Sequence, residues 1–180
     1  MIMSPFSFID TYYPDNNALR RMLLVHSWQV ASRALLVARC HPELHLDKSL
    51  LFQGAMLHDV GIFLTDAPGI HCYGVEPYLL HGCLGGELLR ERGRVDLARF
   101  CERHTGTGLT QADFHSNGLQ VPDVETVPVT LEEQVVCYAD KFYSKSSLYR
   151  ERNAEQVCLS LAKYGDEVVS RFRQWHLLFG

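Results

Sequence analysis

The chain has 180 residues, of which 47% are hydrophobic and 21% are charged, and its formal net charge is −4. This length and composition predict a soluble globular protein with a sizeable core, and they exclude a disordered chain. The negative net charge gives no sign of a basic surface that would bind nucleic acid, although the local charge of a site can differ in sign from the net charge. No apolar segment is long enough to span a membrane, and we expect no secretory signal in the first ten residues.

The six cysteines are scattered along the chain, and no two of them form a Cys-x-x-Cys pair. This spacing excludes the usual structural zinc motifs and does not resemble a disulfide framework. We therefore expect reduced thiols and a cytoplasmic protein. Histidine is abundant, with nine residues, and this excess prompts a search for a metal site.

The amino-terminal part predicts an irregular arm and then a long helix. Residues 1–17 mix aromatic side chains with proline, aspartate and asparagine, so we expect an arm that leads into a helix cap. From 18 to 40, apolar residues recur at steps of three and four, which predicts a helix with one inward stripe. His26 lies on that stripe, and Arg33 follows seven residues later on nearly the same face. Alone, His26 is also compatible with a core histidine that is bonded to a backbone carbonyl.

A second helix is predicted from Leu50 to Asp59, capped by Asp47 or Ser49. It is apolar on nearly every side, so we expect it to be the most buried helix of the protein. His58 and Asp59 stand at its end. Burying these two polar groups is costly unless they pair with each other, pair with an arginine or bind a metal.

The middle of the chain alternates loops with short helices. Residues 62–77 are rich in glycine and proline, which indicates a loop, and a short helix follows His81. Another helix is predicted over 95–104, with His104 at its carboxyl end. Residues 106–130 form the longest irregular stretch, and loops of this length are usually functional lids or disordered segments.

The last part of the chain is again helical. A helix begins at Leu131, because Thr130 and Glu133 have the spacing of a capping box, and it carries Asp140 among apolar neighbours. Residues 153–179 predict two amphipathic helices that are separated near Gly165. Strand-like alternation never extends beyond a few residues. The sequence therefore predicts an all-α fold, a helical bundle with a long loop at about 106–130.

Six polar residues fall on apolar helix faces or at helix ends, namely His26, His58, Asp59, His81, His104 and Asp140. They supply imidazoles and carboxylates and no thiolate. One metal centre explains all of them more economically than six separate buried partners. With Asp59 as a bridge, one metal would take His26, His58 and Asp140, and the other would take His81 and His104.

The second of these metals would keep open positions for water and substrate, which is typical of catalytic rather than structural sites. Mixed imidazole and carboxylate ligands favour transition metals over magnesium, which prefers oxygen ligands. We expect two divalent or trivalent ions, with iron as the first expectation and manganese, cobalt, nickel or zinc as alternatives.

The order of these six residues resembles the HD superfamily of metal-dependent phosphohydrolases, in the variant that holds two metals. The segment His58-Asp59-Val60-Gly61 is similar to the His-Asp-hydrophobic-Gly signature of that family. His81 with the following Gly85 or Gly86 and Leu88-Leu89-Arg90 is similar to its third motif. The segments 103–108 and 138–140 are most similar to the branch that hydrolyses diadenosine tetraphosphate symmetrically. The resemblance covers residues 23–143, and it implies a single HD domain over 1–180 with helices 153–179 packed on the core.

Two features depart from the family pattern. Many members carry a lysine directly after the His-Asp-x-Gly motif, where it can meet phosphate, and this chain has Ile62 there. The segment from 108 to 130 is also longer than in the tetraphosphate hydrolases. Arg33, Lys141 and Lys145 are the candidates that could supply the positive charge instead.

The resemblance implies a metal-dependent phosphohydrolase that cleaves a phosphoester or phosphoanhydride of a nucleotide or a similar small phosphorylated molecule. We assign catalytic roles to Asp59 and Lys141. Four residues are candidates for substrate binding, namely Arg33, Thr105, Thr107 and Lys145. We expect no nucleic-acid or membrane partner, and the oligomeric state stays open, with a dimer among the options.

A different enzyme class uses the same ligand set. Some proteins with a six-ligand HD centre resemble inositol oxygenase and the phosphonate-cleaving oxygenases, in which a mixed-valent di-iron pair activates dioxygen. The metal ligands alone do not separate this alternative from hydrolysis. A third alternative is a fold that only senses a ligand or a metal, without catalysis.

Overall fold

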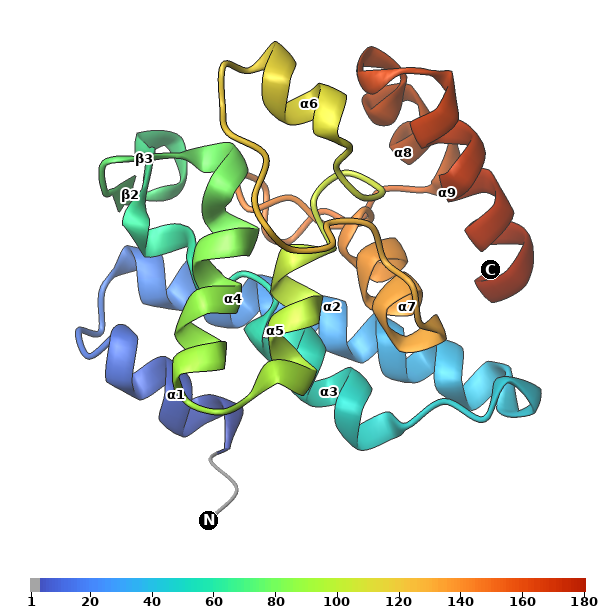
Figure 1. The fold of residues 1–180 in the computed structure, drawn as a ribbon. Helices are drawn as coiled ribbons and strands as arrows, with labels where there is room; N and C mark the ends of the chain where they lie inside the picture. The colour runs from blue at the N-terminus through green and yellow to red at the C-terminus, as the bar shows by residue number, and fades with distance from the viewer. Residues whose placement is uncertain (1–3) are drawn as a thin grey trace.

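The computed structural model in Figure 1 describes residues 4–180, and it confirms the predicted all-α fold. Its helices are α1 (Pro5–Tyr12), α2 (Ala18–Cys40), α3 (Lys48–Leu57), α4 (His81–Glu91), α5 (Val95–Glu102), α6 (Gln111–Ser116), α7 (Leu131–Asp140), α8 (Ala154–Leu161) and α9 (Asp166–Phe179). Each of the described helices is too short or too polar to cross a membrane.

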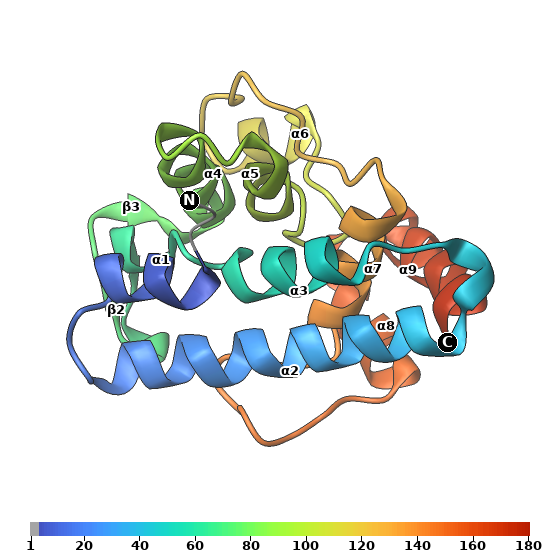
Figure 2. The ribbon, with the colours of Figure 1, turned by 90° about the horizontal axis from the view of Figure 1, so that it is seen from below.

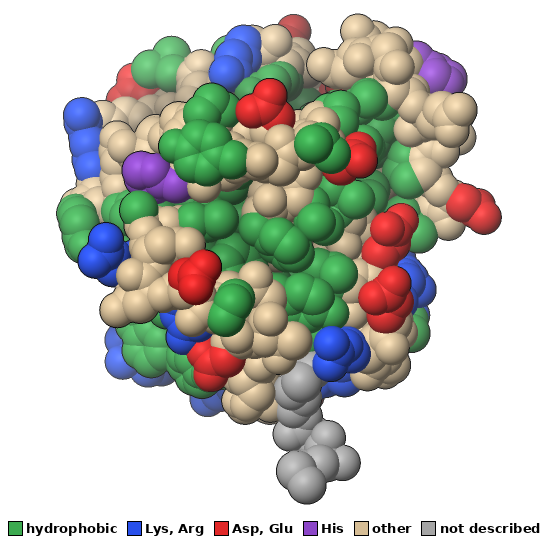
Figure 3. Space-filling view, turned by 90° about the vertical axis from the view of Figure 1, so that its left-hand side faces the viewer, with side chains coloured by type: hydrophobic (Ala, Val, Ile, Leu, Met, Phe, Trp, Pro, Cys, Tyr) green, Lys and Arg blue, Asp and Glu red, His purple; other side chains and the backbone are tan. Residues whose placement is uncertain are grey.

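The only sheet in the described residues lies within the predicted loop of residues 62–77. It has three short strands, β1 (Thr65–Ala67), β2 (Cys72–Tyr73) and β3 (Glu76–Pro77), in the order β2-β1-β3. Strand β1 pairs antiparallel with β2 and parallel with β3. Figure 3 faces the side of the molecule on which β2 and β3 lie in Figure 1, and hydrophobic side chains gather near its centre.

Helix α2 runs along one side of the molecule, beneath α3 and α7 (Figure 2). It begins where the Asn17 side chain accepts a hydrogen bond from the Arg20 amide at 2.9 Å, and it ends one residue before His41-Pro42. The predicted inward stripe is confirmed, because Leu23, His26, Val30, Ala34 and Val37 are buried. One face of α2 thus carries His26 into the core.

Helix α3 is buried between α2, α5 and α7. Asp47 caps it, as predicted, by accepting hydrogen bonds from two backbone amides of the first turn at 2.8 and 3.0 Å. The helix ends at Leu57, so His58 and Asp59 lie just beyond its last residue rather than within it. Both side chains are fully buried. The predicted end was two residues too late, which is a common uncertainty of helix boundaries.

Glycines allow α4 to approach the turn after Asp59 and helix α5 closely. A Cβ atom on Gly61 would lie 2.3 Å from the carbonyl oxygen of His81, and a Cβ atom on Gly82 would lie 2.4 Å from that of Cys101. Neither side chain could be added without moving a backbone. The packing of these glycines therefore brings His81, the first residue of α4, to the turn that carries Asp59.

The expectation of an irregular arm over residues 1–17 is wrong for residues 5–12, which form helix α1. Ser4 caps this helix through a 3.1 Å hydrogen bond from the Ser7 amide, and Pro5 takes the first helical position. Proline is favoured there because the missing N–H would have no partner within the helix. Phe8 and Ile9 anchor the helix in the core.

The predicted long loop at about 106–130 contains one element that was not expected. Helix α6 begins with a full capping box, in which Thr110 and Asp113 each bond to the backbone of the other. Phe114 is fully buried and anchors the helix. With six residues, α6 is too short to show a helical period in the sequence.

The carboxyl-terminal helices follow the prediction, because α8 and α9 are separated at Gly165, which has a φ of 111°. Helix α7 begins with the expected capping box of Thr130 and Glu133. The rings of Tyr138 on α7 and Phe172 on α9 stack with centroids 5.5 Å apart. This contact fixes α9 against the helix that ends with Asp140 (Figure 1).

Candidate metal centre

Six side chains from five parts of the fold meet in the interior, and they are the six predicted metal ligands. His26 comes from α2, His58 and Asp59 from the turn after α3, His81 from the start of α4, His104 from just after α5, and Asp140 from the end of α7. None of them is more than 8% exposed. Five of the six lie at or next to a helix end, so the packing of the helices sets the geometry of the cluster.

One side of the cluster lies around the Oδ2 atom of Asp59. The Nε2 atoms of His26 and His58 are each 3.2 Å from this oxygen. Asp140 completes this side, because its Oδ1 atom is 3.0 Å from Nε2 of His26 and 3.6 Å from Nε2 of His58. These are the four residues that the sequence assigns to one metal.

The other side lies around the Oδ1 atom of Asp59. The Nε2 atom of His81 is 3.4 Å from this oxygen, and that of His104 is 3.3 Å from it. The two Nε2 atoms are 3.0 Å apart. Each carboxylate oxygen of Asp59 therefore faces a different pair of imidazoles, which is the arrangement that a bridging carboxylate requires.

Backbone carbonyls orient three of the four imidazole rings. Each of these rings places Nδ1 against a carbonyl oxygen, namely His58 against Ala55 at 2.6 Å, His81 against Tyr78 at 2.6 Å and His104 against Cys101 at 2.8 Å. A carbonyl only accepts, so Nδ1 carries the hydrogen and the lone pair of Nε2 is directed into the cluster. This tautomer is the one that binds metal through Nε2.

The donor set fits a metal. Both oxygens of Asp59 are buried and lack a hydrogen bond of proper geometry among the described residues, although Nζ of Lys145 lies 2.7 Å from Oδ2. A buried carboxylate needs a cation or several donors to balance its desolvation. Two groups of ligand atoms lie close enough to hold an ion, namely His26, His58 and Asp140, and His58, Asp59 and His104.

The protonation of the cluster suits this role. Burial raises the pKa of Asp59, but the charges of Lys145 and His58 outweigh it and hold the pKa well below its usual value. Burial and the neighbouring His104 lower the pKa of His81 to about 3. Burial lowers the pKa of His58, but Asp59 and Asp140 raise it to about 9. Of Asp59, His81 and His58, only His58 must therefore lose a proton before a metal binds at neutral pH.

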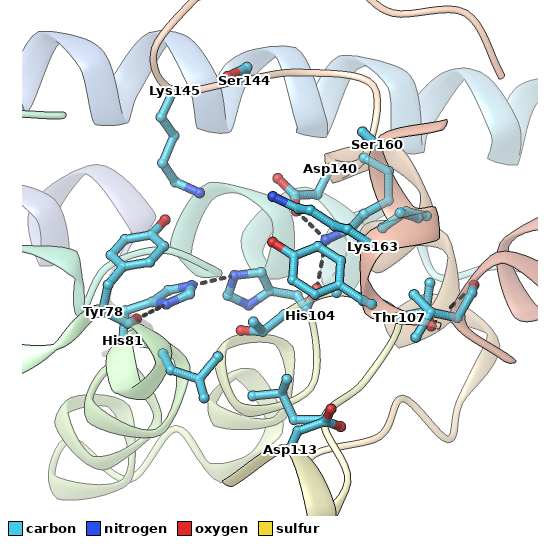
Figure 4. A pocket seen from close by; sticks show the side chains of 18 of the residues that line it. Tyr78, His81, His104, Thr107, Asp113, Asp140, Ser144, Lys145, Ser160 and Lys163 are labelled. Carbon is cyan, nitrogen blue, oxygen red and sulfur yellow. Dashed lines mark hydrogen bonds and ion pairs between the residues drawn. The ribbon is translucent and has the colours of Figure 1, made fainter. Parts of the chain in front are cut away.

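A cavity of about 750 Å³ opens beside the cluster. His81, His104 and Asp140 line it (Figure 4), whereas His26, His58 and Asp59 are buried and do not line it. The predicted substrate ligands Thr105, Thr107 and Lys145 also line this cavity, together with Lys141. The structure thus brings three of the four predicted substrate ligands to one cavity beside the predicted metal ligands.

The two lysines after α7 contact different ligands. Nζ of Lys141 lies 2.7 Å from Oδ2 of Asp140 and donates to the carbonyl oxygen of His104 at 2.9 Å. The Nζ atom of Lys145 instead lies 2.7 Å from Oδ2 of Asp59. Figure 4 shows the Lys145 side chain directed toward the Tyr78 ring. Lys141 therefore connects two of the predicted metal ligands, while Lys145 neutralises the central carboxylate.

Arg33 is the one predicted substrate ligand that the structure does not bring to the cavity. Its guanidinium lies over the Phe142 ring, 3.3 Å from the centroid, and pairs with Glu151. Seven residues of helix rise by about 10 Å, so a residue on the face of His26 still points to a different part of the protein. The role of Arg33 in substrate binding therefore stays a prediction that this cavity does not support. Ile62 is fully buried in the core and cannot replace the lysine of the family pattern.

Sequence reasoning missed several residues of the cavity. The Tyr78 ring stacks on His81 with centroids 4.6 Å apart, and its carbonyl also orients that histidine. Arg152, Ser160 and Lys163 line the far side of the cavity. The capping spacing of Asn153 and Gln156 indicates the helix that carries Ser160, but no local pattern shows that it reaches the metal ligands.

The helical fold and the imidazoles on both sides of one buried carboxylate are typical of a family of metal-dependent enzymes. The chain belongs to the HD domain family, because the model of the family described as "HD domain" matches residues 23–144. This range agrees with the resemblance found from the motifs alone.

Two archaeal relatives are named tRNA (cytidine(56)-2'-O)-methyltransferase. The chain is 30% identical to the one from Picrophilus torridus, over 83% of this chain and 42% of the relative. It is 28% identical to the one from Thermoplasma volcanium, over 78% of this chain and 40% of the relative. An uncharacterized protein of Methanocaldococcus jannaschii is 38% identical over 53% of this chain and 49% of that protein. The chain thus spans less than half of these curated relatives, and no solved structure matches it.

Proposed function

We propose that this protein is a metal-dependent phosphohydrolase that cleaves a phosphoester or phosphoanhydride bond of a small phosphorylated molecule, a nucleotide in the first instance. The observation that carries the proposal is the cavity itself. Its inner end has the metal ligands His81, His104 and Asp140, and two lysines stand beside them. An anionic substrate group is the natural partner of such a site.

His26, His58, Asp59, His81, His104 and Asp140 would hold two metal ions, with Asp59 between them. When bound, such ions supply an activated water at neutral pH and neutralise charge on phosphoryl oxygens. Iron is our first choice, and manganese, cobalt, nickel and zinc have the same preference for imidazole and carboxylate ligands.

The remaining roles belong to the chain itself. Lys145 lies between Asp59 and the cavity, where its ammonium can bind a phosphoryl oxygen. Lys141 keeps Asp140 and the His104 backbone in fixed positions and adds a second positive charge. Thr105 and Thr107 line the cavity next to His104. The Thr105 hydroxyl can bind the substrate, whereas Thr107 is fully buried and its hydroxyl donates to the Val168 carbonyl oxygen at 3.5 Å.

The test begins with protein purified without chelator, whose metals are counted by mass spectrometry. A panel of nucleotides and phosphate esters is then assayed for phosphate release, with and without oxygen. We expect release under anaerobic conditions, and we expect Asp59→Ala to lose both bound metal and turnover. An Asp59→Ala protein that keeps its metals and its phosphatase activity would rule the proposal out.

Two other outcomes are informative. Oxygen uptake by the iron-loaded protein, without anaerobic phosphate release, would favour the di-iron oxygenase alternative. The names of the two archaeal methyltransferases describe proteins more than twice as long as the matched segment. We therefore do not propose methyl transfer for this chain.

A further inference from the structure

The cavity has two walls of different origin. The wall with His81, His104 and Asp140 lies inside residues 23–144, the segment that matches the HD domain family. The opposite wall, here called the C-terminal wall, lies beyond that segment and consists of Arg152, Ser160, Leu161, Lys163, Tyr164 and Val168. We propose that Arg152, Ser160 and Lys163 of this wall form a second anion-binding subsite, which takes a phosphoryl group beyond the one held at the metal ligands. The proposal rests on the proposed function.

Charge is the first support for this subsite. The C-terminal wall contains two cations and no carboxylate. The carboxylates elsewhere in the cavity are already engaged, because Asp140 contacts His26 and Lys141, and Asp113 caps helix α6. The positive charge of the wall therefore has no counter-ion among the residues that line the cavity.

The donors of the wall are only partly used. Arg152 donates one hydrogen bond, from Nη1 to the Ser160 hydroxyl at 3.5 Å, and a guanidinium has five N–H donors. The Nζ atom of Lys163 lies 4.8 Å from the centroid of the Tyr164 ring and forms no ion pair among residues 4–180. Figure 4 shows the Lys163 side chain directed across the cavity toward Asp140. Arginine and lysine with a nearby hydroxyl are the groups that bind phosphoryl oxygens.

The wall is held at a fixed distance from the metal ligands. The Arg152 amide donates to the carbonyl oxygen of Phe142 at 2.8 Å, two residues after Asp140. Leu161 is buried, and α9 is stacked on α7 through Phe172 and Tyr138. A substrate that reaches both walls must therefore have a defined length, so this wall would select among phosphorylated molecules.

The consequence is a preference for a chain of phosphates over a single phosphate ester. A nucleoside triphosphate or another polyphosphate could place one group at the metal ligands and another at Arg152 and Lys163. A monophosphate ester would leave the second subsite empty. The exposed ring of Tyr164 adds an aromatic surface next to the subsite, suited to stacking with a base.

Binding is measured separately from catalysis. Metal-free wild-type protein is titrated with inorganic tripolyphosphate in the calorimeter at moderate salt, so that chelation of metal by the probe plays no part. We expect binding, and we expect Arg152→Gln and Lys163→Gln each to raise the Kd about tenfold, since each removes a charge-assisted hydrogen bond. Lys48→Gln is the control for net charge, because Lys48 is exposed at the start of α3 and does not line the cavity. Unchanged melting temperatures show that the variants are folded.

Three results would overturn the subsite, namely no binding by the wild type, unchanged affinity in both wall variants, or an equal loss in Lys48→Gln. Phosphate release by the metal-loaded protein is scored independently. Hydrolysis with unaltered tripolyphosphate affinity in the variants refutes the subsite and leaves the hydrolase in place. Loss of affinity in the wall variants without any hydrolysis refutes the hydrolase and supports the subsite.

Discussion

The ammonium of Lys145 lies 2.7 Å from Oδ2 of Asp59, a carboxylate that is fully buried at the centre of the metal-ligand cluster. The same oxygen faces His26 and His58, the ligands of one expected metal. A single side chain therefore provides, in the metal-free protein, part of the positive charge that a metal would provide. Lys145 has to move or share this oxygen when a metal binds.

Replacing Lys145 with methionine should destabilise the metal-free protein more than the metal-loaded one. Methionine keeps most of the side-chain volume and removes the charge, which leaves Asp59 buried without its cation. Breaking a buried pair in this way costs on the order of 3 kcal/mol. Urea unfolding with and without chelator measures the difference, and Lys48→Met is the surface control. Equal losses of stability with and without metal would contradict this role of Lys145.

Metal binding should release a proton from His58. The pKa of His58 is raised to about 9 in the metal-free fold, above the reference value of about 6.5, so its ring is charged at pH 7. A metal requires the neutral ring, and loading at pH 7 should therefore acidify the solution. Calorimetry in buffers of different ionisation enthalpy counts the protons. The count should fall as the pH rises through 9, and a count that does not depend on pH would argue against this state of His58.

The same shift has a consequence for stability without metal. Because the pKa of His58 is raised in the folded state, its charged ring adds to the free energy of unfolding. This contribution is fully present below the unfolded pKa of about 6.5 and is lost as the pH rises through about 9. The metal-free protein should accordingly lose stability between these two limits. The metal-loaded protein should not show this loss, since its His58 is neutral throughout. Denaturation midpoints across this pH range provide the comparison.

The helices and the six-ligand cluster could be predicted because their signals are local or ordered along the chain. His26 shows its apolar stripe, and His58-Asp59 shows its motif at the end of a buried helix. The cavity could not be predicted in the same way, since Lys163 reaches it only through the packing of α9 on α7. The contacts of Arg33 could not be predicted either, because Phe142 and Glu151 lie far from it in the sequence and reach it only in the folded chain. Helix α1 could not be predicted from composition, because proline usually interrupts a helix and Pro5 stands at the first helical position instead.

Gly61→Ala should impair the metal site without touching a ligand directly. The added Cβ atom would lie 2.3 Å from the His81 carbonyl oxygen and 2.4 Å from the Gly85 amide nitrogen. Helix α4 must then move away from the turn that carries Asp59, and His81 moves with it. We expect a loss of about 1–3 kcal/mol in stability, as for other overpacked cores. We also expect weaker metal binding on the side of the cluster that carries His81. Gly69→Ala is the control, because a Cβ atom there meets nothing within 4 Å. Metal content equal to that of the control would contradict the proposed dependence on this glycine.

The Arg33→Gln variant tests whether Arg33 stabilises the fold or binds the substrate. Arg33 lies over the Phe142 ring and pairs with Glu151, and it does not line the cavity. The variant should therefore lose about 1 kcal/mol of stability, the size of a cation–π contact at a partly exposed site, while its KM for a phosphorylated substrate stays within about twofold of the wild type. Lys145→Met, at the cavity, should instead raise KM by about tenfold, as expected for the loss of one charge-assisted hydrogen bond. A large rise of KM in Arg33→Gln with normal stability would instead support Arg33 as a substrate-binding residue.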